Sequence, residues 1–356
     1  MPDVEDPQPG GPTRRVLLLA GAVTVGAAAL GVQVAASAAS RRTGVVAASP
    51  VASGTPTPTP TLDPLPDPTP FATFPTLANP GVMQDFSYLP AISTFFVTQK
   101  SAGSEAAFET LIISRVNASG AVLDAMTLID GGHGLGIEAE SQPDATYIWV
   151  TWQGKSLESG WRENDFVRFR YTPGSWSRAD AVGQLGLVVL PLKDEPEAQF
   201  RFDWKNDWAV ERHYDWNGAT ETYKRRRISD ISNGVMLPDE QLDRLPLPVD
   251  PPTTQGFATI DDTFYRWLGR GTVGDAIEPT DPITLQRFDW KTGRLLAEQH
   301  FSTVSKVGTS WPGGKFEPEG MCMFREPDGA ATLLVGDTTG LPKHEHHVSA
   351  FARITI

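Results

Sequence analysis

The chain has 356 residues, of which 40% are hydrophobic and 21% charged, as in a globular protein with ample core material. Its net charge of −13 argues against nucleic acid as a partner, because affinity for phosphate depends on clustered Lys and Arg. The one basic run in the body, at residues 224–227, is interpreted as a solvated strand edge. The single cysteine, Cys322, excludes a disulfide within the chain.

The first forty residues have the layout of an export signal. Arg14 and Arg15 precede an uncharged stretch at 16–40 whose Ala and Gly bury little apolar surface, which disfavours a permanent anchor. Small residues at 36–38 supply a cleavage site. The segment resembles a twin-arginine signal peptide, whose paired arginines the translocase reads as an address. We expect residues 1–40 to be this signal, with an uncleaved membrane anchor as the alternative.

Residues 41–80 have the composition of a linker. Thr and Pro alternate at 55–60, and further prolines follow up to Pro80. Because proline lacks the amide donor of a β-ladder, this stretch predicts an extended, disordered Pro/Thr-rich spacer. A spacer of this kind would separate a domain from a surface.

Residues 81–356 carry the signals of an all-β domain. Short runs of β-branched and aromatic residues, such as 94–98, 147–151 and 285–290, are bounded by Gly-containing turn pairs. No long stretch has an apolar period of 3.6 residues, which excludes a largely helical domain.

A loose repeat divides this domain into five units. In each unit a segment with Gly or an acid beside an apolar residue precedes an aromatic-rich strand by about ten residues. The first segments are 84–86, 132–138, 198–203, 255–259 and 316–321, and the strands after them are 95–99, 147–152, 208–212, 264–267 and 333–337. Hairpins at 114–120, 168–174, 213–218 and 287–293 are interpreted as equivalent outer hairpins.

Five units of roughly 55 residues each favour a five-bladed β-propeller, with a six-bladed propeller or a pair of β-sandwiches as alternatives. The first strand of each unit would line the central channel, where close backbone approach favours Gly. The C-terminal strand at 350–355 would close the ring by completing a blade with N-terminal strands.

Several motifs also resemble a known family. Residues 132–138 (GHGLGIE), 147–149 (YIW), 287–290 (RFDW) and 316–320 (FEPEG), in this order, resemble the β-propeller family of phage receptor-binding proteins and teichoic acid biosynthesis protein C. The bacteriocin helveticin J is similar to the same group. The resemblance spans about residues 82–356. It implies a five-bladed propeller at or beyond the cell surface, with wall polymers or other glycans as ligands and no established catalytic mechanism.

Four residues are candidates for polar contacts with a ligand. His133, between two glycines, suits close approach to a ligand and could form an acid–base pair with Glu138; a buried structural histidine is the competing interpretation. Glu317 and Glu319 flank Pro318, and an extended backbone there puts both carboxylates on one side of a strand. Paired carboxylates serve glycoside hydrolysis, or they can bond the amides of neighbouring blades.

Aromatic and amide side chains complete the candidate ligand-binding residues. Of ten tryptophans, seven recur near strand ends and turns, Trp204 among them. Trp149 and Trp267 are the tryptophans chosen for sugar binding, and Gln255 is the amide. The same rings would also pack well between blades. The His-rich run at 344–347 suggests only adventitious metal binding or none, so no metal or cofactor is predicted.

The sequence thus predicts an exported, monomeric and non-enzymatic propeller that binds a cell-envelope glycan or a teichoic-acid-like wall polymer. Its other partner would be the twin-arginine translocase during export, and its place the medium, the cell surface or the cell wall. Two alternatives stay open. One is a polysaccharide hydrolase or lyase with His133 and Glu319 as acid–base residues, and the other is a helveticin-like antibacterial protein.

Overall fold

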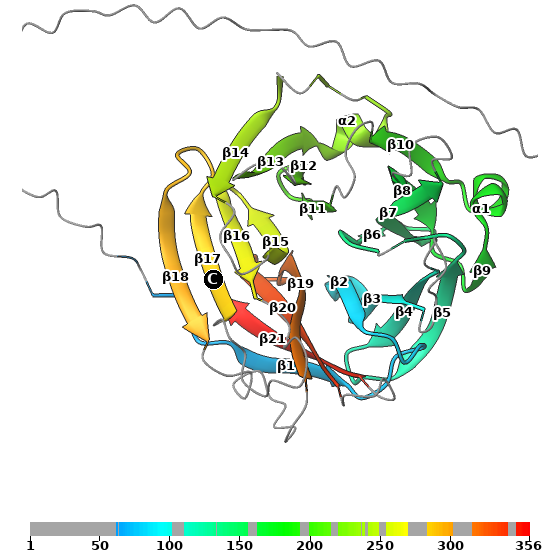
Figure 1. The fold of residues 1–356 in the computed structure, drawn as a ribbon, viewed down its shortest axis with the longest axis horizontal. Helices are drawn as coiled ribbons and strands as arrows, with labels where there is room; N and C mark the ends of the chain where they lie inside the picture. Colours follow the sequence, from blue (N-terminus) through cyan, green and yellow to red (C-terminus); the bar gives the residue numbers. More distant parts are fainter. Residues whose placement is uncertain are drawn as a thin grey trace, which may run out of the picture. The chain divides into compact units, whose positions relative to one another are not determined.

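The computed structural model describes residues 62, 64–101, 110–132, 134–155, 162–192, 199–214, 220–235, 237–238, 241–248, 254–269, 283–301, 315–340 and 347–356. Their strands form five sheets arranged around a common axis, which confirms the all-β, five-bladed propeller (Figure 1). Within these residues, every helix is too short or too polar to cross a membrane.

In each blade, four antiparallel strands follow one another from the axis outward. Blade 1 holds β2 (Met83–Leu89), β3 (Thr94–Lys100), β4 (Leu111–Asn117) and β5 (Val122–Leu128), with the 3-10 helix η1 (Pro90–Ile92) after β2. Blade 2 holds β6 (Glu138–Ser141), β7 (Thr146–Lys155), β8 (Arg162–Arg170) and β10 (Val188–Leu192). Blade 3 holds β11 (Gln199–Asp203), β12 (Trp208–Tyr214), β13 (Thr220–Arg227) and β14 (Asp243–Pro248), with α2 (Ile228–Ser232) after β13.

The last two blades complete the ring. Blade 4 holds β15 (Thr254–Ile260), β16 (Thr263–Leu268), β17 (Ile283–Asp289) and β18 (Leu295–Phe301). Blade 5 holds β19 (Lys315–Arg325), β20 (Ala331–Gly340), β21 (His347–Thr355) and β1 (Thr69–Phe74). The N-terminal strand β1 pairs antiparallel with the C-terminal strand β21, which confirms the predicted closure of the ring.

Strand β1 lies inside the stretch 41–80 that the sequence analysis assigned to a linker. Its ladder with β21 shifts register between Pro70 and Ala72. An edge strand with a bulge is where a sheet accepts proline, because the missing amide there interrupts no interior ladder. The side chain of Phe74 is fully buried against Phe95 of β3, so this strand contributes to the core as well as to the ladder.

Two of the four predicted hairpins are not equivalent to the others. The turns within 114–120 and 287–293 join the third and fourth strands of blades 1 and 4, as expected. In contrast, 213–218 connects β12 to β13, the second and third strands of blade 3. After β8 the chain instead adds β9 (Gly174–Trp176) in parallel to β5 of blade 1, and α1 (Arg178–Gln184) leads back to β10. Turn residues indicate where a turn lies, but not which strands it joins.

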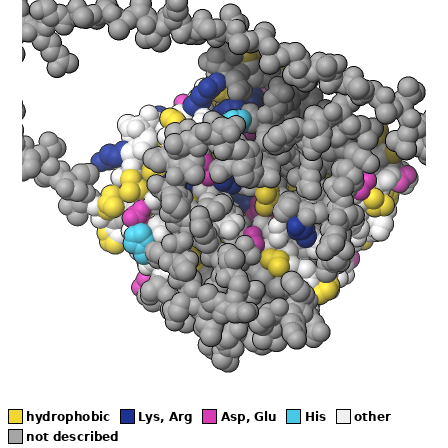
Figure 2. Space-filling model, in the orientation of Figure 1, with side chains coloured by type: hydrophobic (Ala, Val, Ile, Leu, Met, Phe, Trp, Pro, Cys, Tyr) yellow, Lys and Arg dark blue, Asp and Glu magenta, His cyan; other side chains and the backbone are white. Residues whose placement is uncertain are grey.

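The basic run at 224–227 is not a solvated edge. Strand β13 pairs with a neighbour on each side, and the side chains of Lys224, Arg225 and Arg226 are buried, leaving Arg227 exposed. Arg226 Nε pairs with Glu211 Oε2 at 2.6 Å, and Arg225 Nη1 lies 3.1 Å from an oxygen of Asp262 in blade 4. Carboxylates of an adjacent strand and an adjacent blade therefore neutralise Arg226 and Arg225. On the face seen in Figure 2, the described acidic and basic side chains are interspersed.

The first segments of the five repeats lead into or form the inner strands, whose backbones touch at the axis. A Cβ at Gly136 would lie 2.6 Å from Phe200 N, and one at Gly256 would lie 2.8 Å from the carbonyl carbon of Gly320. A Cβ at Gly320 would lie 2.4 Å from Asp85 Oδ1. We call this level of Asp85, Gly136, Phe200, Gly256 and Gly320 the waist. As expected, glycine lies on β15 and β19 and shortly before β6, whereas β2 and β11 contain none.

Alanine at Gly320 tests the waist. Gly320 has φ +74°, and Gly234 has the similar φ of +72° but nothing within 4 Å of its Cβ position, so Gly234→Ala measures backbone strain alone. We expect that control to lower the free energy of unfolding by about 1 kcal/mol, and Gly320→Ala to cost about 2 kcal/mol more, because Asp85 and its strand must shift. Denaturant unfolding gives both values. Equal losses would show that the waist is not tightly packed.

Candidate functional site

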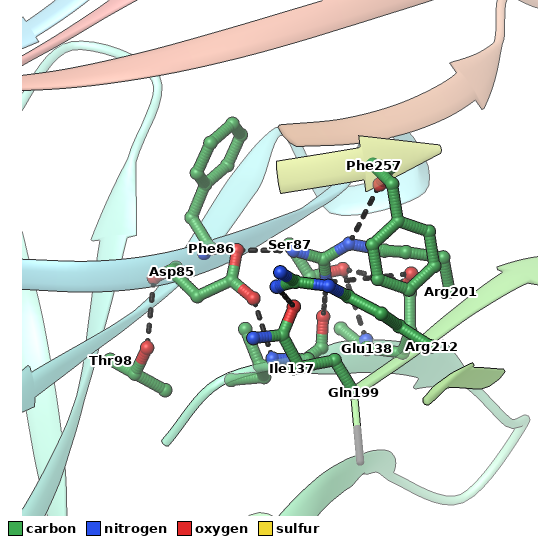
Figure 3. Close-up of polar contacts among 12 residues, drawn as sticks. Asp85, Phe86, Ser87, Thr98, Ile137, Glu138, Gln199, Arg201, Arg212 and Phe257 are labelled. Carbon is green, nitrogen blue, oxygen red and sulfur yellow. Dashed lines mark hydrogen bonds and ion pairs between the residues drawn. The ribbon is translucent and has the colours of Figure 1, made fainter. Parts of the chain in front are cut away.

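One arginine lies at the centre of the waist and connects its own blade to three others (Figure 3). The side chain of Arg201, on β11, is only 3% exposed and forms an ion pair with Asp85 of β2. Its Nη1 lies 3.7 Å from Glu138 Oε1 and donates a hydrogen bond of 2.6 Å to the carbonyl of Ile137. Its Nε donates to the carbonyl of Phe257 on β15 at 3.3 Å.

The partners of Arg201 are themselves held by hydrogen bonds. Asp85 accepts from the amide of Phe86 at 2.8 Å and from the amide of Gly136 at 2.6 Å. Burial acts to lower the pKa of Arg201, but the carboxylates of Asp85 and Glu138 raise it above its usual value. The guanidinium therefore stays charged, and it is stable inside the ring because it is both paired and hydrogen-bonded.

Glu138 sits between this buried cluster and an open cavity. Its Oε1 accepts from the amide of Phe202 at 3.2 Å, and its Oε2 accepts from Ser87 Oγ at 3.4 Å. Burial raises the pKa of Glu138 to about 7, against the opposing effect of Arg201. The carboxyl is therefore divided between its neutral and ionised forms near neutral pH.

The cavity has a volume of about 300 Å³ and lies where β2, β11, β15 and β19 end. We call it the axial pocket. Glu138 and Ser87 line it beside the waist, and Trp204, Lys205 and Arg325 line it where the strands end. Trp204 follows β11, is 43% exposed, and stands edge-on to Phe202 with a centroid distance of 4.9 Å. Its ring is thus a supported aromatic surface open to a ligand.

A hydrogen-bonded network from three blades fixes the rim of the axial pocket. Asp261, in the turn between β15 and β16, accepts from Asn206 Nδ2 at 2.7 Å and pairs with Arg325 Nη2 at 2.9 Å. Lys205 Nζ lies 3.9 Å from the same carboxylate, and its side chain is 60% exposed. Asp203 accepts from the amide of Asp261 at 2.7 Å. The bonds from Asn206 and Arg325 lower the pKa of Asp261, so the rim presents fixed charges of both signs.

Glu138 is the predicted ligand residue that lies in the axial pocket. Gln255 and Glu317 lie near the starts of β15 and β19, at the opposite ends of the inner strands. Glu319 precedes Gly320 of the waist and is 5% exposed. His133 lies outside the described residues, so the structure does not place the suggested pair with Glu138.

The two predicted tryptophans pack between blades and do not line the pocket. Trp149 is fully buried, stacks on Phe166 and donates from Nε1 to Glu140 at 2.7 Å. Trp267 is 1% exposed and contacts Phe301 edge-on. Their burial assigns both rings to the core.

For the His-rich run at 344–347, the first three residues lie outside the described part of the chain. In the part that the structure does describe, no group of three or more His, Cys, Asp or Glu side chains is placed to hold a metal ion.

Sequence reasoning did not single out Trp204, Lys205, Asp261 and Arg325 as a group. One signal pointed toward them: residues 203–207, Asp-Trp-Lys-Asn-Asp, follow directly on a segment recognised as an inner strand. A turn at that position must lie at an end of the axis. The contribution of Arg325 depends on bringing β19 beside this turn, which no local pattern reveals.

Comparisons with known proteins agree with this architecture. Residues 82–350 match the sequence profile of a family described as "Phage 5-bladed beta propeller receptor binding platform domain". A Bacillus subtilis (strain 168) protein named "Putative major teichoic acid biosynthesis protein C" is 24% identical over 269 residues, 74% of this chain and 58% of that protein. The solved tail fiber of Staphylococcus aureus phage P68 aligns with a TM-score of 0.61 at 18% identity, over 82% of this chain and 53% of the fiber. The chain thus spans little more than half of either relative.

The pKa of Glu138 predicts a pH dependence of stability. Between pH 4.5 and 7 the folded protein holds a proton that the unfolded chain has released, so this stabilisation is complete below pH 4.5 and is lost as the pH rises through 7. Glu138→Gln cannot titrate. The free energy of unfolding of the wild type, minus that of Glu138→Gln, should therefore fall by about 3 kcal/mol at most between pH 5 and 8. A difference that stays constant over this range would contradict the assignment.

Proposed function

Because this chain belongs to the family of phage five-bladed β-propeller receptor-binding platform domains, we propose that it is a non-enzymatic binding protein for a cell-envelope glycan or wall polymer. The observation that carries the proposal is Trp204, 43% exposed beside a cavity of about 300 Å³ whose polar rim is already fixed. The ligand would bind in this axial pocket.

The chemistry of the axial pocket suits a sugar. A sugar ring has apolar faces and a hydroxylated edge, and the ring of Trp204 offers an apolar surface with a polar neighbourhood. Lys205, Arg325 and Asp203 supply donors and acceptors around it. Because Asp261 already pairs with Arg325 at 2.9 Å, little conformational entropy of that side chain is lost when a ligand binds.

The relatives support a ligand on the cell surface. One carries teichoic acid biosynthesis in its name, and the other is a phage tail fiber. A teichoic-acid-like wall polymer is therefore the first ligand to test. Of the two acid–base residues of the hydrolase alternative, Glu319 is buried at the waist and is not among the lining residues of the pocket, and His133 lies outside the described residues, so this alternative stays a prediction. The antibacterial alternative stays a prediction.

The proposed place of action is outside the cytoplasm. Residues 1–40, with Arg14 and Arg15 before an uncharged stretch, would direct export through the twin-arginine translocase, although they lie outside the described residues. The folded monomer would then act in the medium or at the cell wall, or remain anchored if the signal is not cleaved. Fractionation of producing cells checks this, and confinement of the protein to the cytoplasm would contradict it.

Trp204→Ala is the direct test of the proposed site. Loss of the aromatic surface should weaken binding to a soluble wall polymer at least about tenfold, which corresponds to about 1.4 kcal/mol. Calorimetry with polymer purified from cell walls measures the affinity. The matched control is Leu123→Ala, which removes a 50% exposed apolar side chain on β5, far from the lining residues of the pocket. The proposal is wrong if both variants bind as the wild type does.

A further inference from the structure

The axial pocket is closed at the waist and open only where the inner strands end. At the waist the backbones of neighbouring inner strands approach so closely that a single added carbon would collide with them. The side chains of Arg201 and Asp85 fill the same level, and both are almost fully buried. Within the described residues, these contacts close the channel between its two ends. A ligand in the axial pocket must enter and leave by the same opening.

The pocket is also small. Its volume of about 300 Å³ is at the lower limit of ligand cavities, which hold roughly 300–1,000 Å³. Glu138 and Ser87 lie at its closed end, and Trp204 lies where the strands end. A linear polymer cannot pass through such a site. Only a terminal unit of a polymer can enter far enough to reach the carboxyl of Glu138 while its ring covers Trp204.

We infer that the axial pocket takes one terminal or branching sugar unit, inserted end-on, and not an internal stretch of polymer backbone. This inference rests on the proposed function, since it specifies which part of a glycan occupies the same site. The polar groups of the pocket then have two different roles. Glu138 and Ser87 face the inserted end of the sugar, and Lys205 and Arg325 contact the segment that connects it to the rest of the polymer.

With end-on insertion, the affinity depends on the presence of terminal or branching sugars and not on the length of the polymer. The probes are a polyol-phosphate wall polymer with single-sugar branches, the same polymer after removal of the branches, and fragments of each in graded lengths. Free glucose, galactose, N-acetylglucosamine and N-acetylgalactosamine serve as competitors. The purified full-length protein, with Trp204→Ala and Leu123→Ala beside it, is titrated with each probe.

Removal of the branches should lower the affinity at least about tenfold, and one free sugar should compete at roughly millimolar concentration, as expected for a single small ring. Affinity per sugar should not change with fragment length. If unbranched fragments bind better as they lengthen and no free sugar competes, while Trp204→Ala still weakens binding, end-on insertion is wrong and the proposed function stands. If Trp204→Ala binds every probe like the wild type, both fall together.

Discussion

The structure depends on the contact of five inner strands at one level of the axis. Their backbones meet where Gly136, Gly256 and Gly320 leave no room for a side chain. The charge of Arg201, on blade 3, is held there by groups from three other blades. Because a buried charge is stable only when its partners are in place, this level needs all of those blades at once. The same contact closes the channel and so turns one end of it into a pocket.

The repeat of the fold could be predicted from the sequence, because it depends on local patterns of residues. Close backbone approach selects Gly or an acid on each inner strand, and the next strand is rich in aromatic residues, so the five units could be predicted, although not every strand that a turn joins. Features that depend on contacts between segments far apart in the sequence could not be predicted. Strand β1 forms in a Pro-rich stretch because β21 offers it an edge. Residues 224–226 are buried, and Glu211 of a neighbouring strand and Asp262 of a neighbouring blade pair with Arg226 and Arg225.

The site was only partly readable for the same reason. Glu138 stood out through its place in a Gly-rich segment, and that segment does reach the axis. Trp149 and Trp267 have the same chemistry as Trp204, but they lie within second strands and point between blades. Trp204 lies in a turn after an inner strand, where its ring is exposed. Residue type suggests sugar binding for all three, and position in the blade separates them.

Amide hydrogen exchange with and without wall polymer tests most directly whether the axial pocket is the binding site. Exchange should slow in the peptides that contain 87–90, 202–205, 259–261 and 323–326, where the inner strands end and the rim turns begin. The outer strand β5 should not change. Protection confined to the opposite ends of the inner strands, at 254–256 and 315–318, with unchanged exchange around Trp204, would place the ligand elsewhere and contradict the account.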